Sequence, residues 1–147
     1  MIENIQENIF IEGAIPVDLI TEILLHQNRN THTGAYSIFV GQVRDDEIGG
    51  SRVSAVEFTT HTEMALEKFH EIKRSICAKY PLADFLAFHS VGRVLTGEIC
   101  FFVLASSVHR GEAIKACQEA VERIKAEMAI WGKLLLENET AKWKENN

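Results

Sequence analysis

The fold is decided by the segment from Glu98 to Met128, EICFFVLASSVHRGEAIKACQEAVERIKAEM. Its first part, Glu98–Ser107, is apolar on both faces, which is typical of a central strand covered on each side. The second part, His109–Met128, carries apolar residues at helical spacing, and the hydroxyls of Ser106 and Ser107 could cap this helix. The expected buried stripe of the helix consists of Ile114, Cys117, Val121, Ile124 and Met128.

The flanking sequence predicts further strands and helices. Strands are expected over Asn8–Glu12, Ala35–Arg44, Arg52–Thr60 and Asp84–Val91, and helices after Pro16 and over Thr62–Tyr80. The strands on either side of the acidic, glycine-containing loop Asp45–Ser51 are expected to form a hairpin. Because strands and helices do not alternate regularly, the pattern indicates an α+β fold with a largely antiparallel sheet.

Length and composition fit one soluble domain. The chain has 147 residues, of which 46% are hydrophobic, so we expect a single domain over residues 1–147 with a polar tail from about residue 137. No apolar run is long enough to cross a bilayer, so no membrane association is expected. The first residues lack the features of a signal peptide, and a cytoplasmic protein is therefore the expectation.

The net charge of −6 argues against nucleic acid as a partner, because an acidic protein repels a polyanion. It does not exclude a small anionic ligand at a local cluster of basic residues. Cys77, Cys100 and Cys117 have no paired spacing, and the six histidines show no metal-ligand motif. We therefore expect buried structural thiols, no metal and no cofactor.

Four short segments contain basic residues that could contact an anion. His109 and Arg110 stand at a predicted helix N-terminus, where free N–H groups and the helix dipole favour anions. Lys125 flanks the buried stripe of the same helix, so it is either a boundary lysine or a partly desolvated acid, base or nucleophile. Lys133 follows Gly132, which reads most simply as a helix cap, and Arg44 ends its strand. Each position alone is compatible with packing or capping.

Taken together, these residues resemble a known family. The order of Phe39–Arg44, Gly92–Val94 with Gly97–Glu98, Ser107–Arg110, and Ile124–Lys125 through Trp131 is similar to that of the large subunit of molybdopterin synthase, MoaE. The resemblance runs from about Gly34 to Trp143. It implies an α/β-hammerhead fold, a central homodimer, and one small ubiquitin-like sulfur-carrier subunit bound to each protomer in a heterotetramer.

The resemblance also implies an activity, that of a sulfurtransferase. The Gly-Gly tail of the carrier ends in a thiocarboxylate, whose sulfur is transferred to cyclic pyranopterin monophosphate to form the dithiolene of molybdopterin. Arg44, His109 and Arg110 would bind the phosphate and pterin groups. Lys125 matches the principal catalytic lysine, with a role in proton transfer or in a covalent link to the carrier. Two anions must meet in such a pocket, which explains the local cations.

One position departs from the family pattern. Many members have a lysine directly after the tryptophan, where this chain has Gly132, and Lys133 follows one residue later. A turn at Gly132 would let Lys133 act as the second catalytic lysine; otherwise Lys133 points to solvent and Lys125 works without it. Two alternatives to this enzyme are a non-catalytic family member that binds the carrier without turnover, and an unrelated α+β domain that binds a phosphorylated metabolite.

Overall fold

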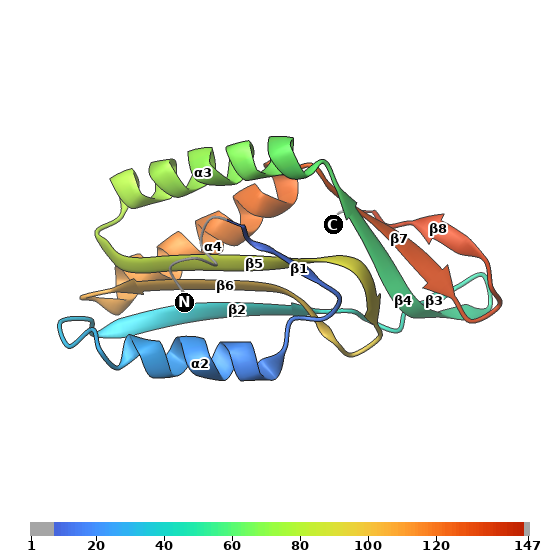
Figure 1. The fold of residues 1–147 in the computed structure, drawn as a ribbon, viewed down its shortest axis with the longest axis horizontal. Helices are drawn as coiled ribbons and strands as arrows, with labels where there is room; N and C mark the ends of the chain where they lie inside the picture. Colours follow the sequence, from blue (N-terminus) through green and yellow to red (C-terminus); the bar gives the residue numbers. More distant parts are fainter. Residues whose placement is uncertain (1–7, 146–147) are drawn as a thin grey trace.

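Three helices and an eight-stranded sheet make up the described part of the chain, residues 8–145 of the computed structural model (Figure 1). The helices are α2 (Val17–Gln27), α3 (Thr62–Lys79) and α4 (Arg110–Glu127). The strands are β1 (Phe10–Glu12), β2 (Ala35–Gln42), β3 (Glu47–Ile48), β4 (Ser51–Thr60), β5 (Leu82–Leu95), β6 (Ile99–Ser107), β7 (Ile130–Leu136) and β8 (Ala141–Trp143).

The main sheet has the strand order β2-β6-β5-β4-β7-β8. Strand β5 is long and changes partner along its length, pairing with β6 up to His89 and with β4 from Gly92. Gly92 has a φ of +78°, a conformation that residues with a side chain rarely adopt. Apart from β1, which runs parallel to β5, the pairings are antiparallel. The predicted α+β class with a mostly antiparallel sheet is confirmed.

The predicted hairpin between the strands Ala35–Arg44 and Arg52–Thr60 is wrong. Strand β2 pairs with β6, whereas β4 pairs with β5 and β7. The reason is burial: Val56 and Phe58 of β4 pack in one cluster with Val94 of β5 and Leu136 of β7. The intervening loop instead folds onto the start of β4, where the short strand β3 forms a tight hairpin.

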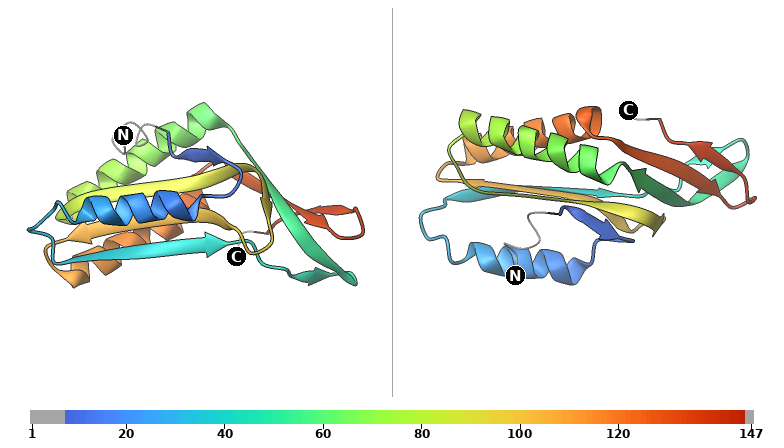
Figure 2. Two further views of the ribbon diagram at one scale, coloured as in Figure 1. Left: turned by 60° about the horizontal axis from the view of Figure 1, so that its bottom comes forward. Right: turned by 45° about the horizontal axis from the view of Figure 1, so that its top comes forward.

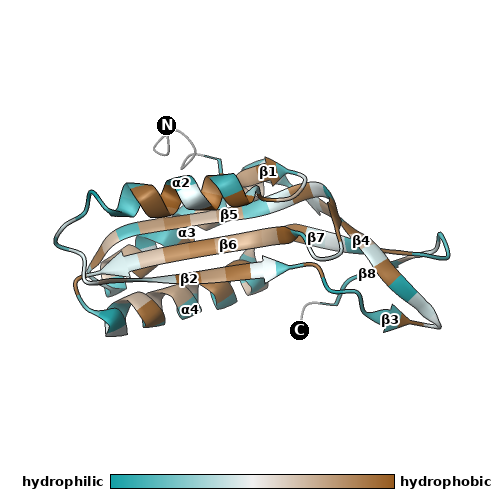
Figure 3. Ribbon diagram, turned by 90° about the horizontal axis from the view of Figure 1, so that it is seen from below, coloured by the Kyte–Doolittle hydropathy of each residue, from teal (hydrophilic) through white to brown (hydrophobic). Residues whose placement is uncertain are grey.

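Helices cover both faces of the sheet formed by β2, β6 and β5. Figures 1 and 2 show α3 and α4 on one face and α2 on the other. Phe101 and Val103 of β6 pack under α3 and α4, while Phe102 and Leu104 pack against the α2 side. Both faces of β6 are therefore buried, as predicted. In Figure 3 the apolar colour accordingly runs along β5 and β6 behind α2.

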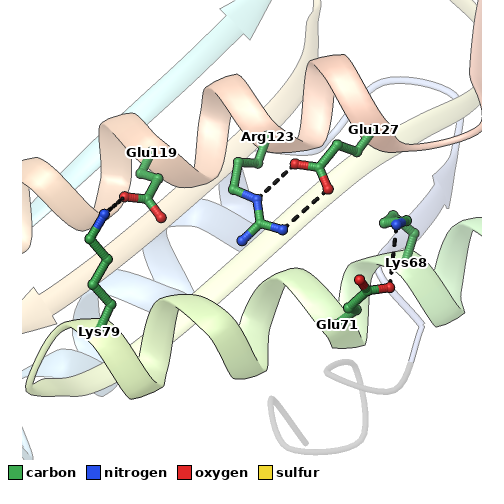
Figure 4. Close-up of polar contacts among 6 residues, drawn as sticks. All are labelled: Lys68, Glu71, Lys79, Glu119, Arg123 and Glu127. Carbon is green, nitrogen blue, oxygen red and sulfur yellow. Dashed lines mark hydrogen bonds and ion pairs between the residues drawn. The ribbon is translucent and has the colours of Figure 1, made fainter.

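The buried face of α4 differs from the predicted one. Ile114 is 53% exposed, whereas Ala113, Ala116 and Ala120 are fully buried beside Cys117. The small alanine side chains let the helix lie close to the sheet, so the larger Ile114 lies outside the contact. Ion pairs add to this packing, since Lys79 at the end of α3 binds Glu119 of α4 at 2.7 Å (Figure 4).

The segment after α4 is a strand rather than a helix cap. Helix α4 ends at Glu127, with Met128 as its C-cap, and Gly132 lies in the middle of β7, paired with Phe58 of β4. Gly132 is absent from the glycines with positive φ, so the predicted turn at this position is wrong. Part of the predicted polar tail forms β8, which pairs with β7 so that Trp143 lies opposite Lys133. None of the helices in residues 8–145 is long and apolar enough to span a membrane.

Candidate functional site

One group of predicted site residues lies at the N-terminus of α4. His109 is the N-cap residue with an extended backbone, and its side chain makes no capping hydrogen bond. The predicted serine cap is wrong, because the hydroxyl of Ser107 donates instead to the carbonyl of Pro81 at 2.8 Å. The first N–H groups of α4 thus face a surface pocket of about 610 Å³ without a capping side chain from His109. The pocket is lined by Gly34, Ala35, Val108, His109, Arg110, Gly111 and Glu112.

Gly34 allows this pocket to form. Its N–H donates to the carbonyl of Ser107 at 3.0 Å, which holds the start of β2 against the segment that leads into α4. A Cβ atom at position 34 would collide with the carbonyl oxygen of Val108. Only glycine therefore lets the two segments approach this closely.

A second group of residues lies at the opposite end of α4. Lys125 is half-buried in its last turn, with its ammonium 5.6 Å from the centre of the Phe101 ring. Arg44 follows the end of β2 and forms an ion pair with Asp46 at 3.2 Å, with its side chain 74% exposed. Because α4 packs on β2 and β6, Arg44 and Lys125 reach the same end of the sheet.

Lys144, directly after β8, joins this second group. Its N–H donates to the carbonyl of Gly132 at 2.8 Å, so the chain beyond Trp143 is held against β7. Lys144 as a whole is exposed, but partial desolvation of its ammonium lowers its pKa, and the positive charges of Lys125 and Arg44 act in the same direction. The thiol of Cys100 lies in the same field, and burial raises its pKa while Lys125 and Lys144 lower it.

Lys133 is placed differently from the other predicted residues. Its ammonium lies 3.8 Å from a carboxylate oxygen of Glu57 and 5.8 Å from the centre of the Trp143 ring. Neighbouring residues of a strand point to opposite faces, so Lys133 and Gly132 face opposite sides of β7.

Within one chain, the two ends of α4 cannot contact one small molecule. Arg110 and Lys125 are fifteen residues apart on a continuous helix, which separates their Cα atoms by about 22 Å. Figure 1 shows the start of α4 beside the end of β6, and its end at the opposite side, where the chain enters β7. The structure therefore brings Arg44 near Lys125 but leaves His109 and Arg110 apart from them.

Sequence reasoning did not identify Lys144 or His89 as neighbours of Lys125. His89 is buried, and its Nδ1 donates to the carbonyl of Ser90 at 2.8 Å. Burial is the main cause that lowers its pKa to about 4. Neither residue belongs to a motif, and the pairing of β8 with β7 is the long-range contact that places Lys144.

The comparison with protein families agrees with this architecture. The sequence model of the family described as MoaE protein matches residues 15–127. The chain belongs to the MoaE family. Its resemblance to that family is thereby confirmed over most of its length.

Several MoaE relatives cover most of this chain. The molybdopterin synthase catalytic subunit of Pyrococcus abyssi is 30% identical over 116 residues, which make up 79% of this chain and 78% of that protein. The protein of the same name from Rattus norvegicus is 33% identical over 77% of this chain. The chain spans 56% of the length of the rat protein.

Solved structures share the fold. A molybdopterin synthase structure from Staphylococcus aureus matches with a TM-score of 0.80 and 26% identity, covering 95% of this chain and 97% of that one. A MoaE protein from Burkholderia ambifaria matches with a TM-score of 0.73 and 26% identity, over 95% of this chain and 90% of that one. The fold assigned from the sequence is thus that of MoaE structures.

Proposed function

We propose that this chain is the catalytic subunit of molybdopterin synthase. It acts as a sulfurtransferase that takes sulfur from the thiocarboxylated C-terminus of a small ubiquitin-like carrier. The acceptor is cyclic pyranopterin monophosphate, and the product carries the molybdopterin dithiolene. The family membership and the names of the relatives support this assignment.

The observation that carries the proposal is the convergence of cations at the end of α4. Arg44 and Lys125 lie at the same end of the sheet and both act electrostatically on Lys144, although the protein as a whole has a net charge of −6. Local positive charge offsets the repulsion between an anionic carrier tail and an anionic substrate that must meet. Half-burial of Lys125 beside the Phe101 ring strengthens its interaction with a bound anion and orients its ammonium for proton transfer.

The phosphate-binding residues are best supplied by a second copy of the chain. His109 and Arg110 lie about 22 Å from Lys125 along α4, too far for one pterin phosphate to contact both ends. Two copies related by a twofold axis would bring the start of one α4 to the end of the other. An exposed apolar row on the edge strand β2, formed by Tyr36, Ile38 and Val40, offers a surface for such pairing.

The activity is tested by incubating the purified chain with thiocarboxylated carrier and cyclic pyranopterin monophosphate. We expect dithiolene product from the wild-type chain and a loss of about a hundredfold or more in Lys125→Ala, the range for removing an acid–base group. Lys115→Ala, which removes an exposed lysine from the same helix, is the matched control and should keep its rate.

Two outcomes would count against the proposal. A wild-type chain that binds the carrier but forms no product would support the non-catalytic alternative, a carrier-binding member of the family. Full activity in Lys125→Ala would remove the proposed centre of the site. The role of Lys133 is tested with Lys133→Ala in the same assay. An unchanged rate of dithiolene formation would exclude Lys133 as the second catalytic lysine.

A further inference from the structure

The side chain of Lys144 lies against the Gly132 face of β7, beside the side chains of Val56 and Phe58. A Cβ atom built on Gly132 would lie 3.4 Å from Cδ of Lys144 and would also touch the side chains of Val56 and Phe58. The backbone fixes this arrangement, since the N–H of Lys144 donates to the carbonyl of Gly132 at 2.8 Å. The stem of Lys144 therefore crosses β7 on the Gly132 face, opposite to Lys133.

The ammonium at the end of this stem is within electrostatic reach of the cations at the end of α4. Lys125 and Arg44 both act on it electrostatically, and Asp46, which opposes them, is already bound to Arg44 at 3.2 Å. Among residues 8–145 no carboxylate forms an ion pair with Lys144. Lys133, by contrast, has Glu57 as a counter-charge. Like charges held together in this way are stabilised when an anion binds between them.

We propose that Lys144 is the second substrate-contacting lysine of the site, and that it binds the carrier's C-terminal thiocarboxylate together with Lys125. This inference rests on the proposed function and adds a residue to it. The thiocarboxylate is assigned to Lys144, and not the phosphate, because His109 and Arg110 of the second copy already supply the proposed phosphate contacts. Lys144 thereby supplies, from beside Gly132, the charge that position 132 lacks.

The first experiment measures steady-state kinetics with each substrate varied in turn. Lys144→Met keeps the aliphatic stem over Gly132 and removes the charge, so packing is preserved. We expect the KM for thiocarboxylated carrier to rise about tenfold or more, the effect of losing one charge-assisted hydrogen bond. The KM for the pterin should stay within about twofold, and Lys144→Arg should recover much of the loss.

The matched control is Lys142→Met, which removes an exposed lysine from β8 two residues earlier and should leave both KM values unchanged. An unchanged carrier KM in Lys144→Met, or a rise in the pterin KM alone, would overturn the assignment. A wild-type chain without turnover would instead refute the proposed function, so the two failures are distinguishable.

A second experiment uses the contact between positions 132 and 144. Gly132→Lys alone should impair carrier binding, because the new stem meets that of Lys144. In Lys144→Ala one of the three side chains around the new stem is removed, leaving Val56 and Phe58. Adding Gly132→Lys should then restore the carrier KM to within about threefold of wild type once these two side chains shift slightly. A double variant whose carrier KM is no lower than that of Lys144→Ala would show that a lysine at position 132 cannot replace Lys144.

A third measurement does not depend on turnover. NMR titration of the Lys144 side chain should show a pKa below the ordinary lysine value of 10.5. Lys125→Ala should raise that pKa, because removing a neighbouring positive charge favours the protonated form. A Lys144 pKa that does not respond to Lys125→Ala would show that the two ammonium groups are not neighbours.

Discussion

At the scale of single residues, His89 links the site to the stability of the fold. Its ring is buried between Phe58 and Phe101, with centroid distances of 5.0 and 5.3 Å. Burial lowers its pKa from 6.5 to about 4, with smaller contributions in the same direction from Lys125 and Lys144. Protonating His89 would place a third positive charge beside these lysines, so the neutral form of the imidazole ring is favoured in the folded protein.

This gives a prediction for the pH dependence of stability. Below pH 6.5 His89 becomes protonated in the unfolded chain, whereas in the folded chain it stays neutral down to about pH 4. The free energy of unfolding should therefore decrease by about 2 kcal/mol between pH 7 and pH 5 on account of this residue. Urea unfolding at both pH values measures it.

The comparison variants are His89→Gln and His32→Gln. His89→Gln should lose this part of the pH dependence, while His32→Gln, at an exposed position, should keep it. Equal pH dependence in His89→Gln and wild type would show that His89 is not buried in its neutral form.

Single residues also show how far the sequence could predict the site. Arg44, His109, Arg110 and Lys125 were found because family motifs contain them, although their roles remain predictions. Lys144 was not found, since its place depends on the pairing of β8 with β7, and nothing in a polar tail reveals that contact.

At the scale of elements, the connection between β2 and α4 depends on one glycine. In Gly34→Ala the new methyl group meets the carbonyl of Val108, so the segment carrying His109 must move. We expect a loss of about 1–3 kcal/mol in the free energy of unfolding, the range for overpacking. Thermal or chemical unfolding measures it.

Gly111→Ala is the matched control for this prediction. Gly111 lies in the same pocket, but nothing stands within 4 Å of a Cβ built there, and alanine favours a helix. This variant should be as stable as wild type or more so. Equal stability of Gly34→Ala and wild type would contradict the close approach of the two segments.

The elements themselves were largely predictable, whereas their pairing was not. The helix α3 and its buried face, Ala65, Phe69, Ile72 and Ile76, follow from spacing alone. Strand β6 was recognised because both of its faces are apolar. The partners of β2 and β4 were not predictable from adjacency, because burial of side chains from distant strands decided them. Gly132 of β7 was interpreted as a helix cap, because a glycine shortly after a helix is ambiguous until its φ is known.

At the scale of the whole molecule, the proposed reaction site is built from two copies of the chain. Lys125 of one copy and Arg110 of the other would act on the same substrate. Variants Lys125→Ala and Arg110→Ala should therefore each be inactive as pure dimers. In a mixed dimer, however, a twofold arrangement places both changes in one site and leaves the other site intact.

The most direct measurement of this claim uses mixed dimers isolated through two different affinity tags. Lys125→Ala and Arg110→Ala chains are expressed together, and the mixed dimer is assayed for dithiolene formation with thiocarboxylated carrier and cyclic pyranopterin monophosphate. A site shared between two copies should give about half of the wild-type activity, since one of the two symmetric sites is complete. A mixed dimer as inactive as either parent would contradict it, because Lys125 and Arg110 would then have to act from the same copy.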